Sequence, residues 1–141
     1  MGAFHYKLEV VPKRFVGDPP LANVPLSEIQ EGLNPWAEPP PPSNHFITEL
    51  RSLLPVDRSR GETEEYVSLN EYSSDLRIWR DQGKVENIEF RYNPYADNWS
   101  LMQNFIAIVK AETCMLVETR SGAVLPPDEV VLKARICDSN A

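Results

Sequence analysis

The fold is decided by residues 75–92, which have the sequence DLRIWRDQGKVENIEFRY. Apolar and polar residues alternate on both sides of the central segment Asp81-Gln82-Gly83-Lys84. Alternation of this kind is typical of half-buried strands, and a short polar segment containing glycine is typical of the turn between them. We therefore predict strands over 75–80 and 85–92 that pair as an antiparallel hairpin.

The register of this hairpin follows from its side chains. Placing Ile78 opposite Ile88 also places Leu76 opposite Phe90, so the apolar residues share one face, whereas a shift of one residue would expose them. The same register aligns three pairs of opposite charge, which are Arg77–Glu89, Asp75–Arg91 and Arg80–Glu86. Each cross-strand pair contributes only about 0.2–1 kcal/mol, so it is their agreement that favours the register.

Similar patterns extend along the rest of the chain. Alternation or short apolar runs predict further strands at 3–11, 65–72, 114–119 and 123–125, with 57–65 as a polar loop. Helical spacing predicts helices at about 44–54, 97–112 and 127–137. Strands in hairpins with segregated helices are typical of an α+β fold. We predict one domain, residues 1–141, with a mainly antiparallel sheet of four to six strands and the helices packed on the face of Ile78 and Ile88.

Residues 12–44 form a proline-rich insert in this pattern. We predict irregular structure there, with one short helix at 26–31 that Ser27 caps and Gly32 ends. Pro39–Pro42 should be extended polyproline II. The spacing of Pro39 and Pro42 matches a minimal SH3 ligand, but no basic residue flanks it, so we favour a stiff connector anchored by Trp36.

Composition is that of a small globular domain. The chain has 141 residues, of which 42% are hydrophobic and 25% charged; these values are close to globular averages. We find neither a secretory signal nor an apolar run of the ~18 residues that a membrane span needs. Cys114 and Cys137 form no CxxC pair, so we expect a reduced, cytoplasmic setting in which both are buried or inert.

Catalytic patterns are missing from the sequence. The two histidines, His5 and His45, belong to no HxH, HExxH or Cys–His cluster, and there is no G-x-S-x-G, P-loop or G-x-G-x-x-G motif. We interpret Glu62, Glu64 and Glu65 as a solvated loop. The sequence therefore assigns no catalytic residue, no metal ligand and no cofactor.

The net charge of −7 disfavours nucleic acid, which would be repelled. It is suited to solubility or to attraction of a basic partner protein, and the sequence leaves both open. A binding surface is suggested by residue types that are frequent in binding hot spots. The candidates on the polar face of the 75–92 hairpin and just after it are Trp79, Arg77, Glu89, Arg91 and Tyr95. The alternative is that Pro39–Pro42 covers Trp79, which would make this contact internal.

From about residue 50 to 141 the order of segments is similar to that of known proteins. The segments that carry the resemblance are Ser52–Pro55, Asp75–Trp79, Val85–Arg91, Cys114–Val117 and Ser121–Pro126. The chain resembles small uncharacterised bacterial proteins, some of which look like immunity proteins of toxin systems. The resemblance implies a bacterial cytoplasmic protein, and it transfers no functional residue.

Three functions remain as hypotheses. The first is a non-enzymatic protein-binding module of immunity or inhibitor type that has a basic partner. The second is a small-molecule-binding domain or minor enzyme with a pocket between the sheet and its helices. The third is a structural subunit that forms a homodimer.

Overall fold

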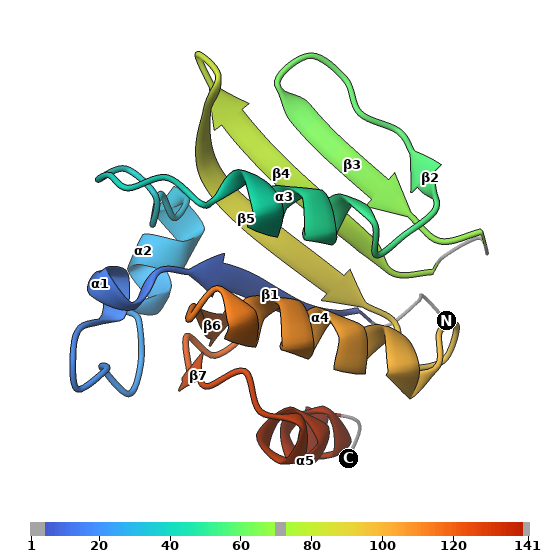
Figure 1. Cartoon of the computed structure of the whole chain (residues 1–141). Helices are drawn as coiled ribbons and strands as arrows, with labels where there is room; N and C mark the ends of the chain where they lie inside the picture. Colours follow the sequence, from blue (N-terminus) through green and yellow to red (C-terminus); the bar gives the residue numbers. More distant parts are fainter. Residues whose placement is uncertain (1–4, 70–72, 140–141) are drawn as a thin grey trace.

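The computed structural model of the chain describes residues 5–69 and 73–139, which form an α+β fold with an open, seven-stranded antiparallel sheet and five helices (Figure 1). The sheet order is β2-β3-β4-β5-β1-β6-β7. The strands are β1 Tyr6–Val11, β2 Val56–Asp57, β3 Thr63–Val67, β4 Asp75–Asp81, β5 Lys84–Tyr92, β6 Met115–Glu118 and β7 Val124–Leu125. The helices are α1 Lys13–Val16, α2 Leu26–Glu31, α3 Asn44–Arg51, α4 Trp99–Ala111 and α5 Glu129–Ser139.

The sheet is larger than the predicted four to six strands. β2 is a two-residue strand that begins just before the predicted loop 57–65, and β3 begins within that loop, at Thr63. The antiparallel pairing is as predicted throughout. The predicted strand ends at residues 3–4 and 70–72 lie outside the described residues.

The register of the β4–β5 hairpin agrees with the prediction at its centre and differs at its turn. Ile78 lies opposite Ile88, but the register shifts between Trp79 and Arg80, so that Arg80 lies opposite Val85 instead of the predicted Glu86. The cause is the turn, in which Gln82 and Gly83 both have positive φ. Such a two-residue turn fixes its own strand pairing, and a bulge adjusts that pairing to the alignment of the buried residues.

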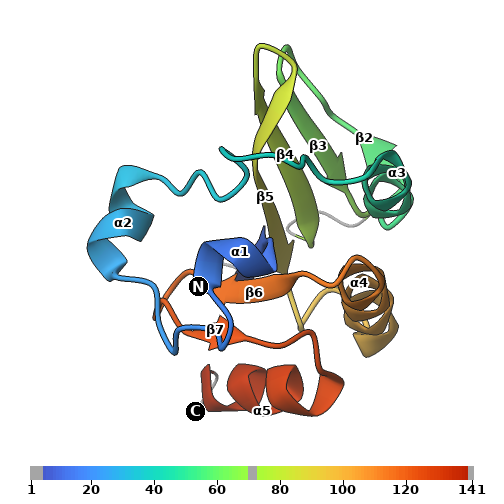
Figure 2. The same cartoon turned by 60° about the vertical axis from the view of Figure 1, so that its left-hand side comes forward.

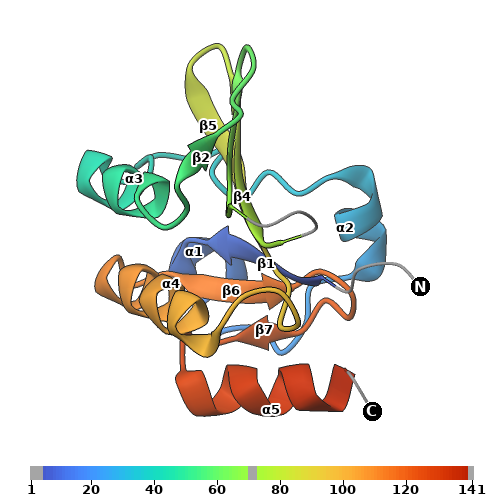
Figure 3. The same cartoon turned by 90° about the vertical axis from the view of Figure 1, so that its right-hand side faces the viewer.

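The inner face of the sheet, which carries Leu76, Ile78, Ile88 and Phe90, is covered by α3, α4 and α5 (Figures 1 and 3). The ring of Phe90 stacks on Phe105 of α4 with 4.2 Å between centroids. This face holds the main hydrophobic core of the molecule, so the helices that we predicted to pack there do so.

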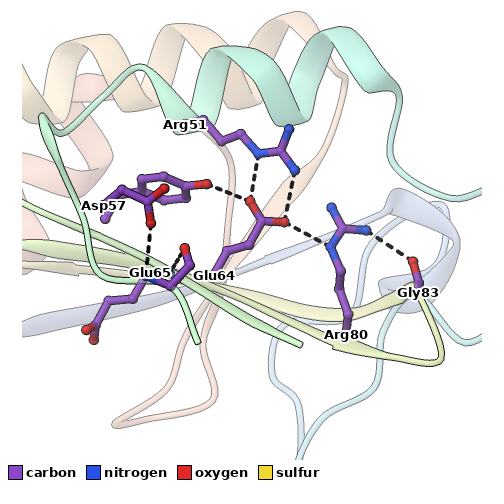
Figure 4. A network of polar contacts seen from close by, with 8 residues as sticks. Arg51, Asp57, Glu64, Glu65, Arg80 and Gly83 are labelled. Atoms are coloured by element: carbon purple, nitrogen blue, oxygen red, sulfur yellow. Dashed lines mark hydrogen bonds and ion pairs between the residues drawn. The ribbon is translucent and has the colours of Figure 1, made fainter. Parts of the chain in front are cut away.

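A polar network fixes α3 to the sheet (Figure 4). The Glu64 carboxylate accepts hydrogen bonds from Arg51 of α3 at 2.6 and 3.0 Å, from Arg80 of β4 at 2.9 Å and from the Tyr66 hydroxyl at 2.7 Å. Burial acts to raise the pKa of Glu64, but the hydrogen bonds from these donors outweigh burial and lower the pKa to about 2. Glu64 is thus a structural anion, and our interpretation of it as part of a solvated loop is wrong.

The end of the insert, residues 12–44, passes to the side of α3 and α4, where Trp36 joins the main core and Ser43 donates hydrogen bonds to Glu112. The rest of the insert, including α2, lies on the opposite side of the sheet (Figures 2 and 3). We call this second side the outward face. Val16, Val24 and Leu33 of the insert pack on Val11 of β1 and Val117 of β6 in a second, smaller core. The prediction of helices on one face only is therefore incomplete, since α1 and α2 occupy the other.

Within the insert, α2 has the predicted bounds and ends at Gly32, which has a φ of 94°. Its N-cap is Pro25, and Ser27 makes no capping hydrogen bond. Further along, the chain bends at Pro39–Pro42, where the Pro39–Pro40 peptide bond is cis, instead of following straight polyproline II.

Trp36 anchors the connector that follows α2, as predicted. Its indole N–H donates a hydrogen bond to the Val10 carbonyl at 3.1 Å. The Arg14 guanidinium lies 5.5 Å from the indole centroid and donates to the carbonyls of Glu38 and Pro40 at 2.5 and 2.7 Å. These contacts hold Pro40 beside α1, where the chain passes round to α3.

None of the helices in the described part of the chain is long and apolar enough to cross a membrane. Within the same residues, no group of three histidine, cysteine, aspartate or glutamate side chains is placed to hold a metal ion. Both cysteines are free. Cys114 is buried, and burial raises the pKa of its thiol to about 12, whereas Cys137 is exposed.

Candidate functional site

The outward face of strands β3, β4 and β5 presents a regular array of charged side chains. The pairing registers place Glu65, Arg77, Glu89 and Glu9 in one row across β3, β4, β5 and β1. The neighbouring row consists of Val67, Asp75, Arg91 and Lys7. Alternation along each strand sends these residues to the side opposite the main core.

Ion pairs connect part of this array. Arg77 Nε lies 2.8 Å from a Glu65 oxygen and 3.6 Å from Asp75, and Arg91 lies 3.5 Å from Asp75. The predicted pairing of Asp75 with Arg91 is confirmed. Arg77 does lie opposite Glu89, but its ion pair is with Glu65, because β3 offers a closer carboxylate that the hairpin alone did not reveal.

Three adjoining depressions hollow out this face. The first, the α2 pocket, has a volume of about 530 Å³ and lies between α2 and the sheet. The second, the arginine hollow, has about 680 Å³ and is lined by Arg58, Arg60 and Arg77 together with Ser59, Thr63, Glu65 and Trp79. The third, of about 550 Å³, includes His5, Asp75, Arg77 and Arg91.

Trp79 stands between the first two depressions and lines both of them. It is partly exposed. Pro40 and Pro41 instead line a separate depression with Trp36 and Cys114. The alternative in which Pro39–Pro42 covers Trp79 is therefore wrong. The insert approaches Trp79 with Ile29 and Leu33, across an open pocket.

The α2 pocket has an apolar side and a carboxylic side. Ile29, Leu33 and Trp79 provide the apolar surface, and Asn87 fixes the chain after α2 by donating a hydrogen bond to the Leu33 carbonyl at 3.1 Å. Facing them on the sheet are Glu9 and Glu89, which lie directly opposite each other on β1 and β5.

Glu9 is the residue of this site that sequence reasoning missed. It is only 4% exposed, and one of its carboxylate oxygens accepts a hydrogen bond from the Ile88 N–H at 2.8 Å. Burial raises the pKa of Glu9 well above its usual range, and the facing Glu89 raises it further. Burial also raises the pKa of Glu89, although Arg91, Lys7 and Arg77 lower it. Pairing the strand at 3–11 with the strand at 85–92 would have brought these two acids together.

The structure brings together four of the five candidates from the sequence. Trp79, Arg77, Glu89 and Arg91 line the three depressions. Tyr95 lines none of them. It is 73% exposed, in the loop between β5 and α4, where its backbone N–H donates to Asn93. We therefore define the candidate site by the outward face without Tyr95.

Comparison of the chain with protein-family models, with curated proteins and with solved structures found no match. The resemblance to small bacterial proteins and to immunity proteins thus stays a prediction. Any assignment of function has to be argued from the outward face itself.

Proposed function

We propose that this chain is a non-enzymatic binding domain of inhibitor or immunity type, and that its outward face receives an acidic segment of a partner protein. The observation that carries the proposal is the arginine hollow, in which Arg58, Arg60 and Arg77 converge beside Trp79. Arginine and tryptophan are the residue types most frequent in binding hot spots, and an arginine fork suits a carboxylate.

The distribution of charge supports an acidic partner at this face. Six of the 14 lysine and arginine residues line the three depressions, but only five of the 21 acidic residues do. One of those five, Glu118, has its carboxylate bound to Arg135. The acidic excess of the chain therefore lies elsewhere, and a basic partner, which the net charge of −7 suggested, would need a different surface.

The arginine hollow keeps a cationic surplus after its internal pairing. Its single carboxylate, Glu65, is engaged by Arg77 at 2.8 Å. Arg58 and Arg60 are exposed in the connection between β2 and β3, where they can reach an incoming chain. A carboxylate of the partner would neutralise this surplus, and its attraction would weaken as salt shortens the screening length to about 10 Å at 0.1 M.

Affinity capture with the immobilised full chain tests this proposal. Arg60→Glu is expected to lower the affinity for the captured partner about tenfold or more, because it replaces a charge attraction by a repulsion. Lys110→Glu makes the same change of charge on α4, on the other side of the sheet, and should leave the affinity unchanged. Equal loss of binding in the two variants, or no loss in either, would contradict the proposal.

The α2 pocket favours a second candidate function, a small-molecule-binding domain, because it is a cavity of the size that small ligands occupy and has both apolar and polar residues in its lining. The homodimer hypothesis is a further prediction, and light scattering over a range of concentrations checks it. A monomer at high concentration would contradict a homodimer.

A further inference from the structure

The Glu9–Glu89 pair destabilises the folded chain, and the fold does not need two acids at these positions. A buried carboxyl group is normally surrounded by hydrogen-bond donors or paired with a cation. Glu118 follows this rule, with Arg135, Tyr6 and Ser121 around its carboxylate. Glu9 does not, since among the described residues only the Ile88 N–H donates to it, and its second oxygen has no hydrogen-bond partner.

Glu89 is less buried than Glu9, and the charges of Arg91, Lys7 and Arg77 act on it from a distance. It makes no ion pair within 4.0 Å in the described part of the chain, while the acids beside it, Glu65 and Asp75, are both paired with arginines. The facing charge of Glu89 disfavours the ionisation of Glu9. Both also line the α2 pocket.

The lining of the pocket indicates the chemistry of that molecule. A cation would meet Lys7 and Arg120 at the same pocket, and an anion would meet Glu9 and Glu89. A neutral molecule with several hydroxyl groups avoids both repulsions, because hydroxyls donate to carboxylates and accept from lysine and arginine. The indole of Trp79 offers an apolar surface against which the carbon-bound hydrogens of a ring can pack.

We propose that the α2 pocket is a binding site for a neutral, polyhydroxylated ring of the sugar or cyclitol class. The ring would lie between the Glu9–Glu89 pair on one side and the indole of Trp79 on the other. Ile29 and Leu33 close the pocket over the ring from α2. The volume of about 530 Å³ accommodates a monosaccharide or a small oligosaccharide. This site is separate from the arginine hollow, which it meets only at Trp79.

The test uses the full chain and a panel of neutral monosaccharides with myo-inositol, each at tens of millimolar. Binding is followed by the NMR signal of the Trp79 indole N–H and by calorimetry. We expect at least one member to shift that signal. Glu9→Gln and Glu89→Gln should each weaken its binding about tenfold, because replacing one carboxyl oxygen by an amide NH2 group removes an acceptor for a ligand hydroxyl. Glu28→Gln, on the exposed surface of α2, is the matched control and should bind normally.

Several outcomes would overturn the proposal. These are no binding by any member of the panel, or binding that neither Glu9→Gln nor Glu89→Gln weakens while both remain folded. Tighter binding of butylammonium or of acetate at the same residues would overturn the neutral class of ligand. Arg60→Glu distinguishes this proposal from that of the acidic partner, because it should weaken partner binding and leave sugar binding unchanged.

Discussion

Two buried glutamates, Glu118 and Glu9, lie on neighbouring strands in opposite surroundings. Glu118 is 1% exposed, and its carboxylate accepts hydrogen bonds from two of the Arg135 nitrogens, at 3.1 and 2.6 Å, and from the hydroxyls of Tyr6 and Ser121, both at 2.5 Å. Glu9 accepts one hydrogen bond, from the Ile88 backbone N–H, and faces a second acid, Glu89. The first residue connects α5 to the sheet, whereas the second weakens the folded state in a place where a ligand can approach.

Glu118→Gln should lower the free energy of unfolding at pH 7 by about 2–4 kcal/mol, since it removes the charge that Arg135 binds beside a buried site. Burial raises the pKa of Glu118, but hydrogen bonds, first from Arg135, lower it to about 2. The lowered pKa stabilises the folded chain above the unfolded value of about 4.3, and this contribution is lost as the pH falls toward 2.

Urea unfolding at a series of pH values checks this prediction. The wild-type chain should lose more stability than Glu118→Gln between pH 5 and pH 3, so that their stabilities converge in acid. Glu28→Gln is the control at an exposed position and should follow the wild type. A constant difference between Glu118→Gln and wild type over this range would show that the charge of Glu118 is not what stabilises α5.

Glu9→Gln should have the opposite effect on stability. Its raised pKa means that ionisation of Glu9 opposes folding, so the wild type loses stability as the pH rises above the unfolded value. The groups that line the pocket with Glu9 include Glu89 of β5, Lys7 of β1, Arg120 after β6 and His5. The amide keeps an acceptor for Ile88, and we expect a melting temperature about 3 °C higher than wild type at pH 8. A variant that melts below the wild type at pH 8 would contradict the claim that ionised Glu9 destabilises the folded chain.

At the scale of elements, the insert is fixed to the sheet at the turn between β6 and β7. The Val24 N–H donates to the Gly122 carbonyl at 2.7 Å, and Val124 donates back to Ala22 at 2.9 Å. Gly122 has a φ of 78°, and a Cβ added there would lie 2.2 Å from the Val24 carbonyl oxygen. The position of α2, and with it the α2 pocket, depends on this close approach.

Gly122→Ala should therefore lower the free energy of unfolding by more than the strain of a left-handed backbone alone would. Gly83 is the matched control, because its φ of 80° is similar but no atom lies within 4 Å of an added Cβ. Gly83→Ala should cost about 1–2 kcal/mol from the left-handed backbone. Gly122→Ala should exceed that and abolish the protection of the Val24 N–H from hydrogen exchange. Equal costs, with Val24 still protected, would mean that the insert is not held at this turn.

Local patterns predicted most elements. The features that they missed depend on one turn conformation and on contacts between distant segments. Alternation defined the β4–β5 hairpin, and Gly32 marked the end of α2. The bulge at Arg80 was missed because it arises from the positive φ of Gln82, which its residue type does not indicate. The Glu9–Glu89 contact was missed because β1 and β5 are about eighty residues apart, and no local signal pairs them.

At the scale of the molecule, the sheet separates two kinds of surface. Its inner face is filled by α3, α4 and α5, and the insert covers part of its outward face (Figure 3), where it packs on Val11 and Val117. The remainder of the outward face holds the charged array and the three depressions. A chain whose acids exceed its bases by seven thus keeps many of its cations on one side of the sheet.

The three tryptophans report on three separate places. Trp36 donates its indole N–H to Val10 under the connector, Trp99 donates to Glu129 at 2.6 Å between α4 and α5, and Trp79 lies on the outward face. Our central claim is that the outward face is where a partner binds. The most direct measurement is an NMR titration of the three indole N–H signals with the partner that the wild-type chain captures. We predict that the signal of Trp79 shifts and that of Trp99 stays in place, whereas a shift of Trp99 with Trp79 unchanged would contradict the claim.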